Sequence, residues 1–338
     1  MSLRNQQISG FLASAGWADA HRRPLAGDAS ARRYDRVVAA DGKTCAVLMD
    51  APTDMGEDTQ PFLQVCTYLL DQGFAAPRII ASDQTLGLIL MEDLGDALYA
   101  RICTSHPDLE QPVYEAAVDV LTALQTRPAP DFLPPYDQKT YLREAGLLTD
   151  WYLPAATGKG SSNDLKAEYD ALMAAAVDAL EGDQSCCVLR DYHAENLLWM
   201  PDRQGVSRVG LLDFQDALCG HPAYDLVSLL EDARRDTPDG LQQAMIARFL
   251  DQTGADATPF RQAYATLGAQ RNLKIVGIFA RLCLRDDKPG YVDLIPRVWA
   301  HLMRDLSHPS LTDLQNFVAR YVPAPENAIL SQIMAAKP

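Results

Sequence analysis

The chain has 338 residues, of which 48% are hydrophobic and 22% are charged, a composition typical of a globular protein in water. Its formal net charge is −15 at pH 7. Binding to nucleic acid or to an anionic membrane without sequence or lipid specificity needs a basic surface, so this charge excludes both. We therefore expect neither nucleic acid nor a membrane as a partner.

The seven cysteines are scattered along the chain, and no Cys-x-x-Cys pair occurs. Such a set is typical of reduced thiols in the cytosol. The N-terminal residues lack the apolar segment of a secretion signal, and no apolar run reaches the length of a membrane span. These features predict a cytoplasmic location.

The first ninety or so residues are rich in strand patterns. Residues 32–50 read as a hairpin with a turn at Asp41 and Gly42, and residues 77–95 contain two further strands. Between them, residues 61–73 carry apolar side chains at helical spacing. We expect a five-stranded sheet with one helix.

Beyond residue 95 the pattern becomes helical. An amphipathic helix is predicted over residues 164–182, because its apolar residues recur on one face. Further helices are predicted around residues 111–127, 222–235, 240–253, 257–285 and 293–306. The chain is therefore predicted to be α+β, with a nucleotide-binding lobe over residues 1–94 and a catalytic and acceptor-binding lobe over residues 95–338.

The most informative motif is the stretch VLRDYHAENLLW, residues 188–199. Protein kinases use R-D-x-x-x-x-N, in which the Asp orients and deprotonates the acceptor hydroxyl and the Asn holds Mg²⁺. Asp191 and Asn196 have that spacing, although Leu189 stands where kinases carry His. Alone, this spacing is weak evidence, because many loops contain it by chance.

The residues that follow strengthen the motif. Apolar runs flank the turn at residues 201–205 and deliver Asp213 at the end of the second run, as D-F-Q. Kinases bring their second metal-binding Asp on such a hairpin, as D-F-G. Asp191 is thus predicted to be the catalytic base, and Asn196 and Asp213 the Mg²⁺ ligands, with ATP phosphates completing the metal shell. The alternative is that both aspartates merely cap turns.

A zinc site is a competing interpretation of the same stretch. His193 and Glu195 match the H-x-E half of a deaminase signature, which needs P-C-x-x-C downstream. Only isolated Cys219 and Cys283 follow, so this interpretation fails. His193 is predicted to lie in the catalytic loop near the acceptor or the phosphate, or else to bond the local backbone.

Two segments of the first lobe are candidates for nucleotide contacts. A turn between strands, in residues 24–37, could cradle phosphate with its backbone amides, or be an ordinary hairpin. Its small or turn-forming residues are Gly27, Asp28, Ala29 and Ser30. After an apolar strand, the backbone of Glu92, Asp93 and Leu94 could pair with an adenine edge.

Two features of the second lobe bear on how the catalytic loop is supported and on which acceptor is bound. Asp225 enters an apolar helix and should have a partner, because a lone buried carboxylate is costly. We expect it to brace the catalytic loop around Arg190. A basic stripe with helical spacing either borders the acceptor pocket or forms a solvated helix face; it consists of Arg271, Lys274, Arg281 and Arg285.

Together these motifs resemble the aminoglycoside phosphotransferase family, the small-molecule branch of the protein kinase-like fold. The resemblance spans nearly the whole chain and rests on LAGDASARRY, LMDAP, LILMEDLGD, LRDYHAENLLW, GLLDFQDALCGHPAYDL and QRNLKIVGIFARLCLRD. The first and last segments are similar to those of bacterial anomeric kinases of N-acetylmuramate and N-acetylglucosamine.

The resemblance implies a two-lobed kinase-like fold, with a small antiparallel-sheet lobe and a larger, mostly helical lobe. It also implies ATP and Mg²⁺ as cofactors. The catalytic Asp would be Asp191, and the metal ligands would be Asn196 and Asp213. Gly27 to Ser30 would form the loop over the phosphates, and Glu92 to Leu94 the nucleotide hinge.

One position departs from the kinase pattern. Kinases carry a third-strand Lys that pairs with the α- and β-phosphates. Here Met49 stands near that place, and Lys43 falls in the preceding turn. Either Arg32 or Arg33 supplies the charge, or the ATP is held differently; alternation places the two arginines on opposite faces, so only one of them can point at the nucleotide.

The predicted function is ATP-dependent phosphorylation of a small molecule, with the anomeric hydroxyl of an amino sugar in cell-wall recycling as the favoured acceptor. Basic residues would suit the lactyl carboxylate of N-acetylmuramate, whereas cationic aminoglycosides prefer acidic pockets. The alternatives are a kinase of aminoglycosides, choline or homoserine, and a non-catalytic nucleotide-binding pseudokinase. A protein kinase is disfavoured, because no A-P-E segment comes soon enough after Asp213 to end a peptide-binding activation loop; the A-P-E at residues 324–326 lies far downstream.

Overall fold

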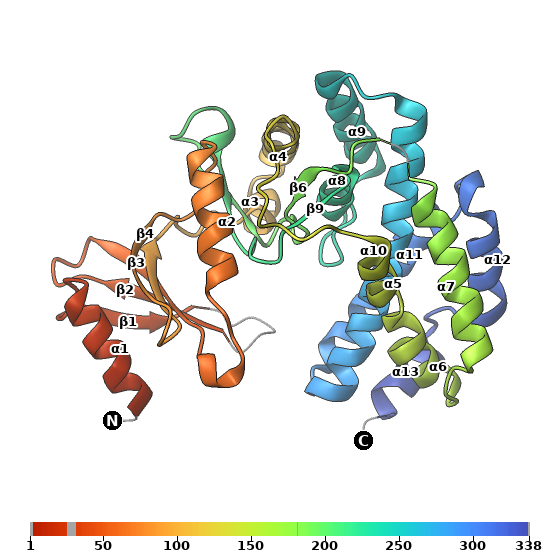
Figure 1. The fold of residues 1–338 in the computed structure, drawn as a ribbon, viewed down its shortest axis with the longest axis horizontal. Helices are drawn as coiled ribbons and strands as arrows, with labels where there is room; N and C mark the ends of the chain where they lie inside the picture. The colour runs from red at the N-terminus through yellow and green to blue at the C-terminus, as the bar shows by residue number, and fades with distance from the viewer. Residues whose placement is uncertain (1–2, 26–31, 181, 337–338) are drawn as a thin grey trace. The chain divides into compact units, whose positions relative to one another are not determined.

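The computed structural model describes residues 3–25, 32–180 and 182–336 (Figure 1). The chain divides into two compact units. The first contains Met1–Val120 and Glu195–Ala217, and the second contains Leu121–Ala194 and Leu218–Pro338. The lobe boundary between residues 94 and 95 stays a prediction, because compactness does not define which residues bind a nucleotide.

A five-stranded antiparallel sheet forms the centre of the first unit (Figure 1). Its strands lie in the order β1-β2-β3-β5-β4. They are β1 (His21–Pro24), β2 (Arg33–Val38), β3 (Cys45–Asp50), β4 (Ile79–Asp83) and β5 (Leu88–Glu92). The predicted β2–β3 hairpin is confirmed, and in its turn the Asp41 carboxylate accepts hydrogen bonds from the amides of Lys43 and Thr44.

Two helices, not one, accompany these strands, so the expectation of a single helix is wrong. Helix α2 (Gln60–Asp71) is the predicted one, and helix α1 (Leu3–Ser14) precedes the sheet. Helix α1 buries only Ile8, Phe11 and Leu12, which pack with apolar residues of β2, β3 and β5. Its apolar periodicity is therefore too short to stand out in the sequence.

The rest of the first unit carries a second, smaller pairing of strands. Its elements are α3 (Tyr99–Ser105), η2 (Pro107–Leu109), most of α4 (Glu110–Gln125), β7 (Leu197–Trp199), η4 (Gly205–Arg208) and β8 (Val209–Leu211). The predicted β7–β8 hairpin is confirmed, with Leu197 opposite Leu211. Backbone hydrogen bonds join Trp199 to Ala97 and Leu211 to Ala75, so both strands of the hairpin are tied to the unit.

The second unit is mostly helical. Its elements are α5 (Gln138–Ala145), the π-helical turn η3 (Leu148–Tyr152), α6 (Leu153–Thr157), α7 (Asn163–Asp178), β6 (Cys186–Val188), β9 (Leu218–Gly220), α8 (Ala223–Leu230), α9 (Asp239–Thr253), α10 (Ala257–Asp286), η5 (Pro289–Leu294), α11 (Ile295–Asp305), η6 (Pro309–Leu311), α12 (Thr312–Tyr321) and α13 (Asn327–Ala335). Helix α10 runs through its centre and packs against α5, α8, α11 and η3 (Figure 1).

The predicted helices are present, with shifted ends. Ser162 caps α7 through its side chain, so this helix begins just before the predicted range and ends at Asp178. Helix α8 ends at Leu230, earlier than predicted, because residues 231–238 turn away after it. Within the described ranges, no helix is long and apolar enough to cross a membrane.

Candidate active site

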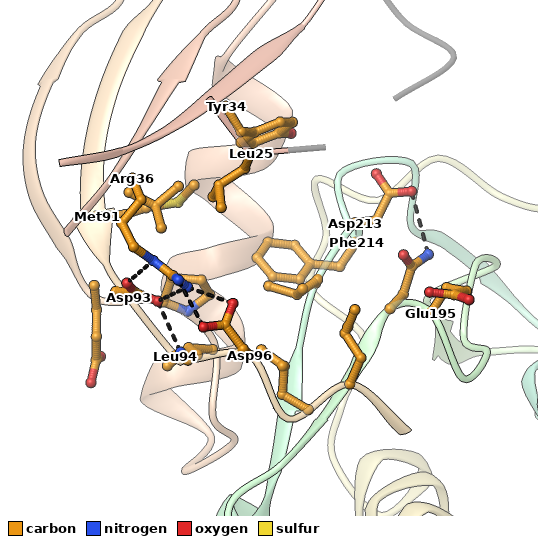
Figure 2. Close-up of a pocket in the computed structure, with 18 of the residues that line it drawn as sticks. Leu25, Tyr34, Arg36, Met91, Asp93, Leu94, Asp96, Glu195, Asp213 and Phe214 are labelled. Carbon is orange, nitrogen blue, oxygen red and sulfur yellow. Dashed lines mark hydrogen bonds and ion pairs between the residues drawn. The ribbon is translucent and has the colours of Figure 1, made fainter. Parts of the chain in front are cut away.

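A cavity of about 370 Å³ lies in the first unit, beside β2, β3 and β5 (Figure 2). The β7–β8 hairpin and its flanking residues contribute the rest of the wall. Side chains that line it include Leu25, Tyr34, Arg36, Met91, Asp93, Leu94, Asp96, Glu195, Asp213 and Phe214. Its mixed apolar and charged lining suits a ligand with an apolar part and a polar part.

An arginine ties one end of the cavity together. Arg36 on β2 forms ion pairs with Asp93 (2.6 Å) and Asp96 (2.7 Å), which follow β5 (Figure 2). Hydrogen bonding to Arg36 lowers the pKa of Asp96, and the two carboxylates raise the pKa of Arg36. These ion pairs hold the segment after β5 against the sheet.

The three predicted hinge residues, Glu92, Asp93 and Leu94, all line this cavity. The Glu92 carboxylate pairs with Arg78 and Arg203, each at 3.0 Å. Burial raises the pKa of Glu92, but the arginines outweigh it and the pKa is lowered. Because the side chains of Glu92 and Asp93 are held in ion pairs, the backbone is the part of this segment suited to pair with a base.

Asn196 and Asp213 come together at the other part of the wall. The Asn196 side-chain amide lies 3.4 Å from the Asp213 carboxylate, and Leu212 donates its amide to the Asn196 carbonyl. Gln215 donates to the second oxygen of Asp213 at 2.7 Å. Phe214 stacks on Phe62 of α2 at 5.0 Å, which fixes the segment containing Asp213 against that helix.

The chemistry of this donor set fits a hard cation such as Mg²⁺. Asp213 offers carboxylate oxygens, and Asn196 offers an amide oxygen once its side chain turns over, an exchange that the similar shape of O and NH₂ permits. Within the described part of the chain, no group of three or more His, Cys, Asp or Glu could hold a metal. A metal here would therefore take its remaining ligands from phosphate and water.

Asp191 belongs to the second unit, on the loop that follows β6. Asp225 at the start of α8 accepts hydrogen bonds from the amides of Leu189 (2.7 Å) and Arg190 (2.8 Å). Ser228 donates to the Arg190 carbonyl at 3.0 Å. Burial raises the pKa of Asp225 to about 7, against the effect of the two amides. These contacts fix the backbone next to Asp191.

The Arg190 side chain is held by a buried carboxylate that the sequence did not single out. Glu144 on α5 forms an ion pair with Arg190 and a second with Lys274 at 2.9 Å. The Tyr136 hydroxyl donates to the same carboxylate at 2.5 Å. Burial raises the pKa of Glu144, but Lys274 and Arg190 outweigh it, so the pKa is lowered and the carboxylate stays ionised.

His193 lies in the same loop of the second unit, and only 9% of it is exposed. Burial lowers the pKa of its ring, and nearby Asp232 and Asp191 partly oppose this. The ring is therefore predominantly neutral near pH 7. A neutral imidazole can donate one hydrogen bond and accept another.

The basic stripe of α10 divides into inner and outer residues. Arg271 is 5% exposed and donates to Ser228 at 2.9 Å, and Lys274 faces Glu144. Arg281 is half-buried, and burial followed by the charge of Arg285 lowers its pKa. The stripe is thus not a uniformly solvated face.

The loop predicted to cover the phosphates lies outside the described residues; it consists of Gly27, Asp28, Ala29 and Ser30. Arg32 follows it, and its Nε lies 2.7 Å from a carboxylate oxygen of Glu57. Both side chains are 15% exposed. Arg33, the neighbouring candidate, is exposed.

Arg36, Asp96 and Glu144 are among the contributors that sequence reasoning did not identify. For Arg36 a signal was present, since it alternates with Tyr34 on a predicted strand and both line the cavity. For Glu144 and Asp96 there was none, because their arginine partners are far away in the chain.

The model of the phosphotransferase enzyme family matches residues 21–264. The chain belongs to this family. It is therefore an ATP-dependent phosphotransferase acting on a small molecule, as the sequence predicted.

Curated relatives of this phosphotransferase extend over nearly its whole length. A protein of Caulobacter vibrioides is 37% identical over 95% of this chain and 98% of its own length. Another, of Pseudomonas aeruginosa, is 34% identical over 94% of this chain and 96% of its own. Each is named N-acetylmuramate/N-acetylglucosamine kinase.

Solved structures show that this phosphotransferase has the kinase-like fold. A choline kinase from Streptococcus pneumoniae matches with a TM-score of 0.63 at 14% identity, over 89% of this chain and 99% of its own. The ADP-bound aminoglycoside phosphotransferase APH(2'')-Ib matches with a TM-score of 0.56 at 13% identity, over 88% and 96% of the two chains. The predicted fold class is confirmed.

Proposed function

We propose that this phosphotransferase transfers the γ-phosphoryl group of ATP to the anomeric hydroxyl of N-acetylmuramate or N-acetylglucosamine. The observation that carries the proposal is that relatives 37% and 34% identical over nearly the whole chain are named as kinases of these two sugars. Recycling of cell-wall sugars is the matching physiological role. We also propose a cytoplasmic location, where ATP is available and the seven cysteines stay reduced.

In this proposal Asp191 aligns the attacking hydroxyl and accepts its proton, as a positioned carboxylate does in kinases. Arg190 and Asp225 support the loop through the contacts described above. Asn196 and Asp213 would hold Mg²⁺, which when bound neutralises charge on the transferred phosphoryl group. Positioning by these side chains supplies most of the catalysis.

The cavity in the first unit supports a proposal for the residues that bind the nucleotide. The backbone of Glu92, Asp93 and Leu94 would pair with adenine, and Arg32 would face the phosphates together with the loop over residues 27–30. Residues 1–94 would form the nucleotide-binding lobe, and residues 95–338 the catalytic and acceptor-binding lobe.

The acceptor residues are proposed to be His193, Arg271, Lys274 and Arg281. Their basic character would suit the carboxylate of N-acetylmuramate. Arg271 and Lys274 already contact Ser228 and Glu144, so they would act on the acceptor through the charge they contribute and through the groups that they position.

The test is turnover with ATP and Mg²⁺ against a panel of N-acetylmuramate, N-acetylglucosamine, kanamycin, choline and homoserine. We expect a 1-phosphate product from the two sugars only, and a loss of at least a thousandfold in kcat for Asp191→Asn. Rapid phosphorylation of kanamycin with inert sugars would overturn the acceptor. Tight ATP binding without turnover of any acceptor would favour a non-catalytic nucleotide-binding protein.

A further inference from the structure

Strand β2 and the residue before it place two arginines on the side of the sheet that faces the cavity. Tyr34 and Arg36 line the cavity, and alternation places Arg32 on the same side, one step beyond the start of the strand. Arg36 and Arg32 are four residues apart, or about 13 Å along an extended chain. Arg36 lies at the end of the cavity where it pairs with Asp93 and Asp96, so Arg32 lies toward the opposite end of the cavity.

Strand β3 lacks the cation that kinases place there. Val47 lines the cavity, and Met49, two residues on and on the same side, lies opposite Tyr34 and is fully buried. The strand Cys45–Asp50 contains neither lysine nor arginine. In kinases the third-strand Lys contacts the phosphates and pairs with a Glu of a helix beside the sheet.

Arg32 has the surroundings that such a cation requires. Its Nε lies 2.7 Å from Glu57, which comes just before helix α2. Burial lowers the pKa of Arg32, but Glu57 and, to a smaller extent, Asp216 close after Asp213 raise it. Phe62 of α2 stacks on Phe214, so the segment containing Asp213 and the start of α2 lie together. Arg32 thus lies toward the metal-binding end predicted for this cavity.

We propose that Arg32, oriented by Glu57, binds the phosphates of the nucleotide in place of the third-strand lysine. A guanidinium has five N–H donors in a fixed plane, so one edge can pair with Glu57 while another binds phosphate. The carboxylate would hold that plane in the orientation the phosphate needs, a positioning role. This proposal rests on the proposed function only in assuming that the ligand is a nucleoside triphosphate.

The experiment measures nucleotide binding by calorimetry, without any acceptor sugar. Four variants are compared with the parent chain: Arg32→Met, Arg32→Lys, Glu57→Gln and, as the matched control, exposed Arg33→Met. The ligands are MgATP and adenosine, which has the base and ribose but no phosphate. Thermal unfolding of each variant shows whether it is folded.

We expect Arg32→Met to weaken ATP binding by about tenfold to a hundredfold, the range for a charged hydrogen bond, and to leave adenosine binding unchanged. Arg32→Lys should recover part of the loss, and Glu57→Gln should weaken ATP binding less than Arg32→Met does. Arg33→Met should bind both ligands as the parent does. In turnover assays, KM for ATP should rise while KM for the sugar stays constant.

Equal ATP affinity in Arg32→Met and the parent would overturn the role of Arg32. An equal loss for ATP and adenosine would also overturn it, because the residue would then act on the whole site. These outcomes are independent of the acceptor. A parent chain that binds ATP but phosphorylates no sugar contradicts the proposed function and leaves this inference standing, whereas a parent chain that does not bind ATP contradicts both.

Discussion

Arg190 and Asp213 adopt a backbone conformation that non-glycine residues rarely adopt. Among the described residues, three non-glycine residues have positive φ: Arg190 (70°), Asp213 (56°) and Asp287 (52°), the last at the end of α10. Such conformations cost about 1 kcal/mol or more and tend to occur at functional sites. Arg190 directly precedes Asp191, the predicted catalytic residue, and Asp213 is itself a predicted metal ligand. Hydrogen bonds from Arg190 to Asp225 and from Ser228 to Arg190 offset the cost of the Arg190 conformation.

His193 gives a prediction about acid stability. Its folded-state pKa is depressed by burial, so the unfolded chain takes up a proton first as the pH falls below about 6.5. The free energy of unfolding should therefore fall between about pH 6.5 and pH 5. His193→Gln should reduce this dependence, measured by urea unfolding across that range. His301, also with a burial-depressed pKa, accounts for a part that remains.

His106 provides the control for that measurement, because it is exposed. His106→Gln should keep the pH dependence of the parent chain. Identical dependence in His193→Gln and His106→Gln would contradict the assignment of the effect to His193.

At the scale of elements, the contact between α5 and α10 beneath the catalytic loop is the main support of Arg190. It joins Glu144 of α5 to Lys274 of α10 and to Arg190 in one buried cluster. Removing one partner of a buried ion pair leaves a charge uncompensated, which is more costly than replacing both.

Lys274→Met should therefore lower the free energy of unfolding by about 3 kcal/mol. The double variant Glu144→Gln/Lys274→Met should lose less than the sum of the two single variants, because Lys274 is then not left without its carboxylate; only Arg190 loses that partner. Urea denaturation measures both. Lys166→Met, which removes an exposed pair with Asp150, is the control and should cost less than about 1 kcal/mol.

If Lys274→Met instead costs no more than Lys166→Met but raises KM for the sugar, the lysine serves the acceptor and not the cluster. Stability and KM thus separate the two roles proposed for this residue.

Local elements were predictable from the sequence where the spacing of apolar residues was regular and turn-forming or helix-ending residues stood at its ends. The β2–β3 and β7–β8 hairpins and helix α10 show such patterns, and they position Asn196, Asp213 and the basic stripe. Helix α1 and the ion pairs of Arg36 and Glu144 were not predictable. Helix α1 has little apolar periodicity, and an ion pair between distant residues depends on packing that no local pattern encodes.

At the scale of the whole molecule, the exposure of the cysteine thiols depends on the packing of both units. Cys45 and Cys219 are partly exposed, and the other five cysteines are buried. Burial also raises the pKa of Cys66, Cys187 and Cys219, which disfavours the reactive thiolate.

A thiol reagent should therefore modify the native chain first at Cys45 and more slowly at Cys219, measured by mass spectrometry of peptides. The buried five should react only after unfolding in urea, which serves as the control that all seven are competent. Rapid labelling of Cys66 in the native chain would show that helix α2 does not pack on its neighbours as described.

The first unit is assembled from two chain segments, with residues 121–194 between them. This order has a consequence for synthesis on the ribosome, where folding proceeds from the N-terminus. Strands β1 to β5 emerge early, but Asn196 and Asp213 emerge only after residues 121–194 of the second unit have been made. A nascent chain that stops before residue 195 has the predicted hinge and lacks both predicted metal ligands, so the end of the cavity that would bind phosphate is completed after the five-stranded sheet.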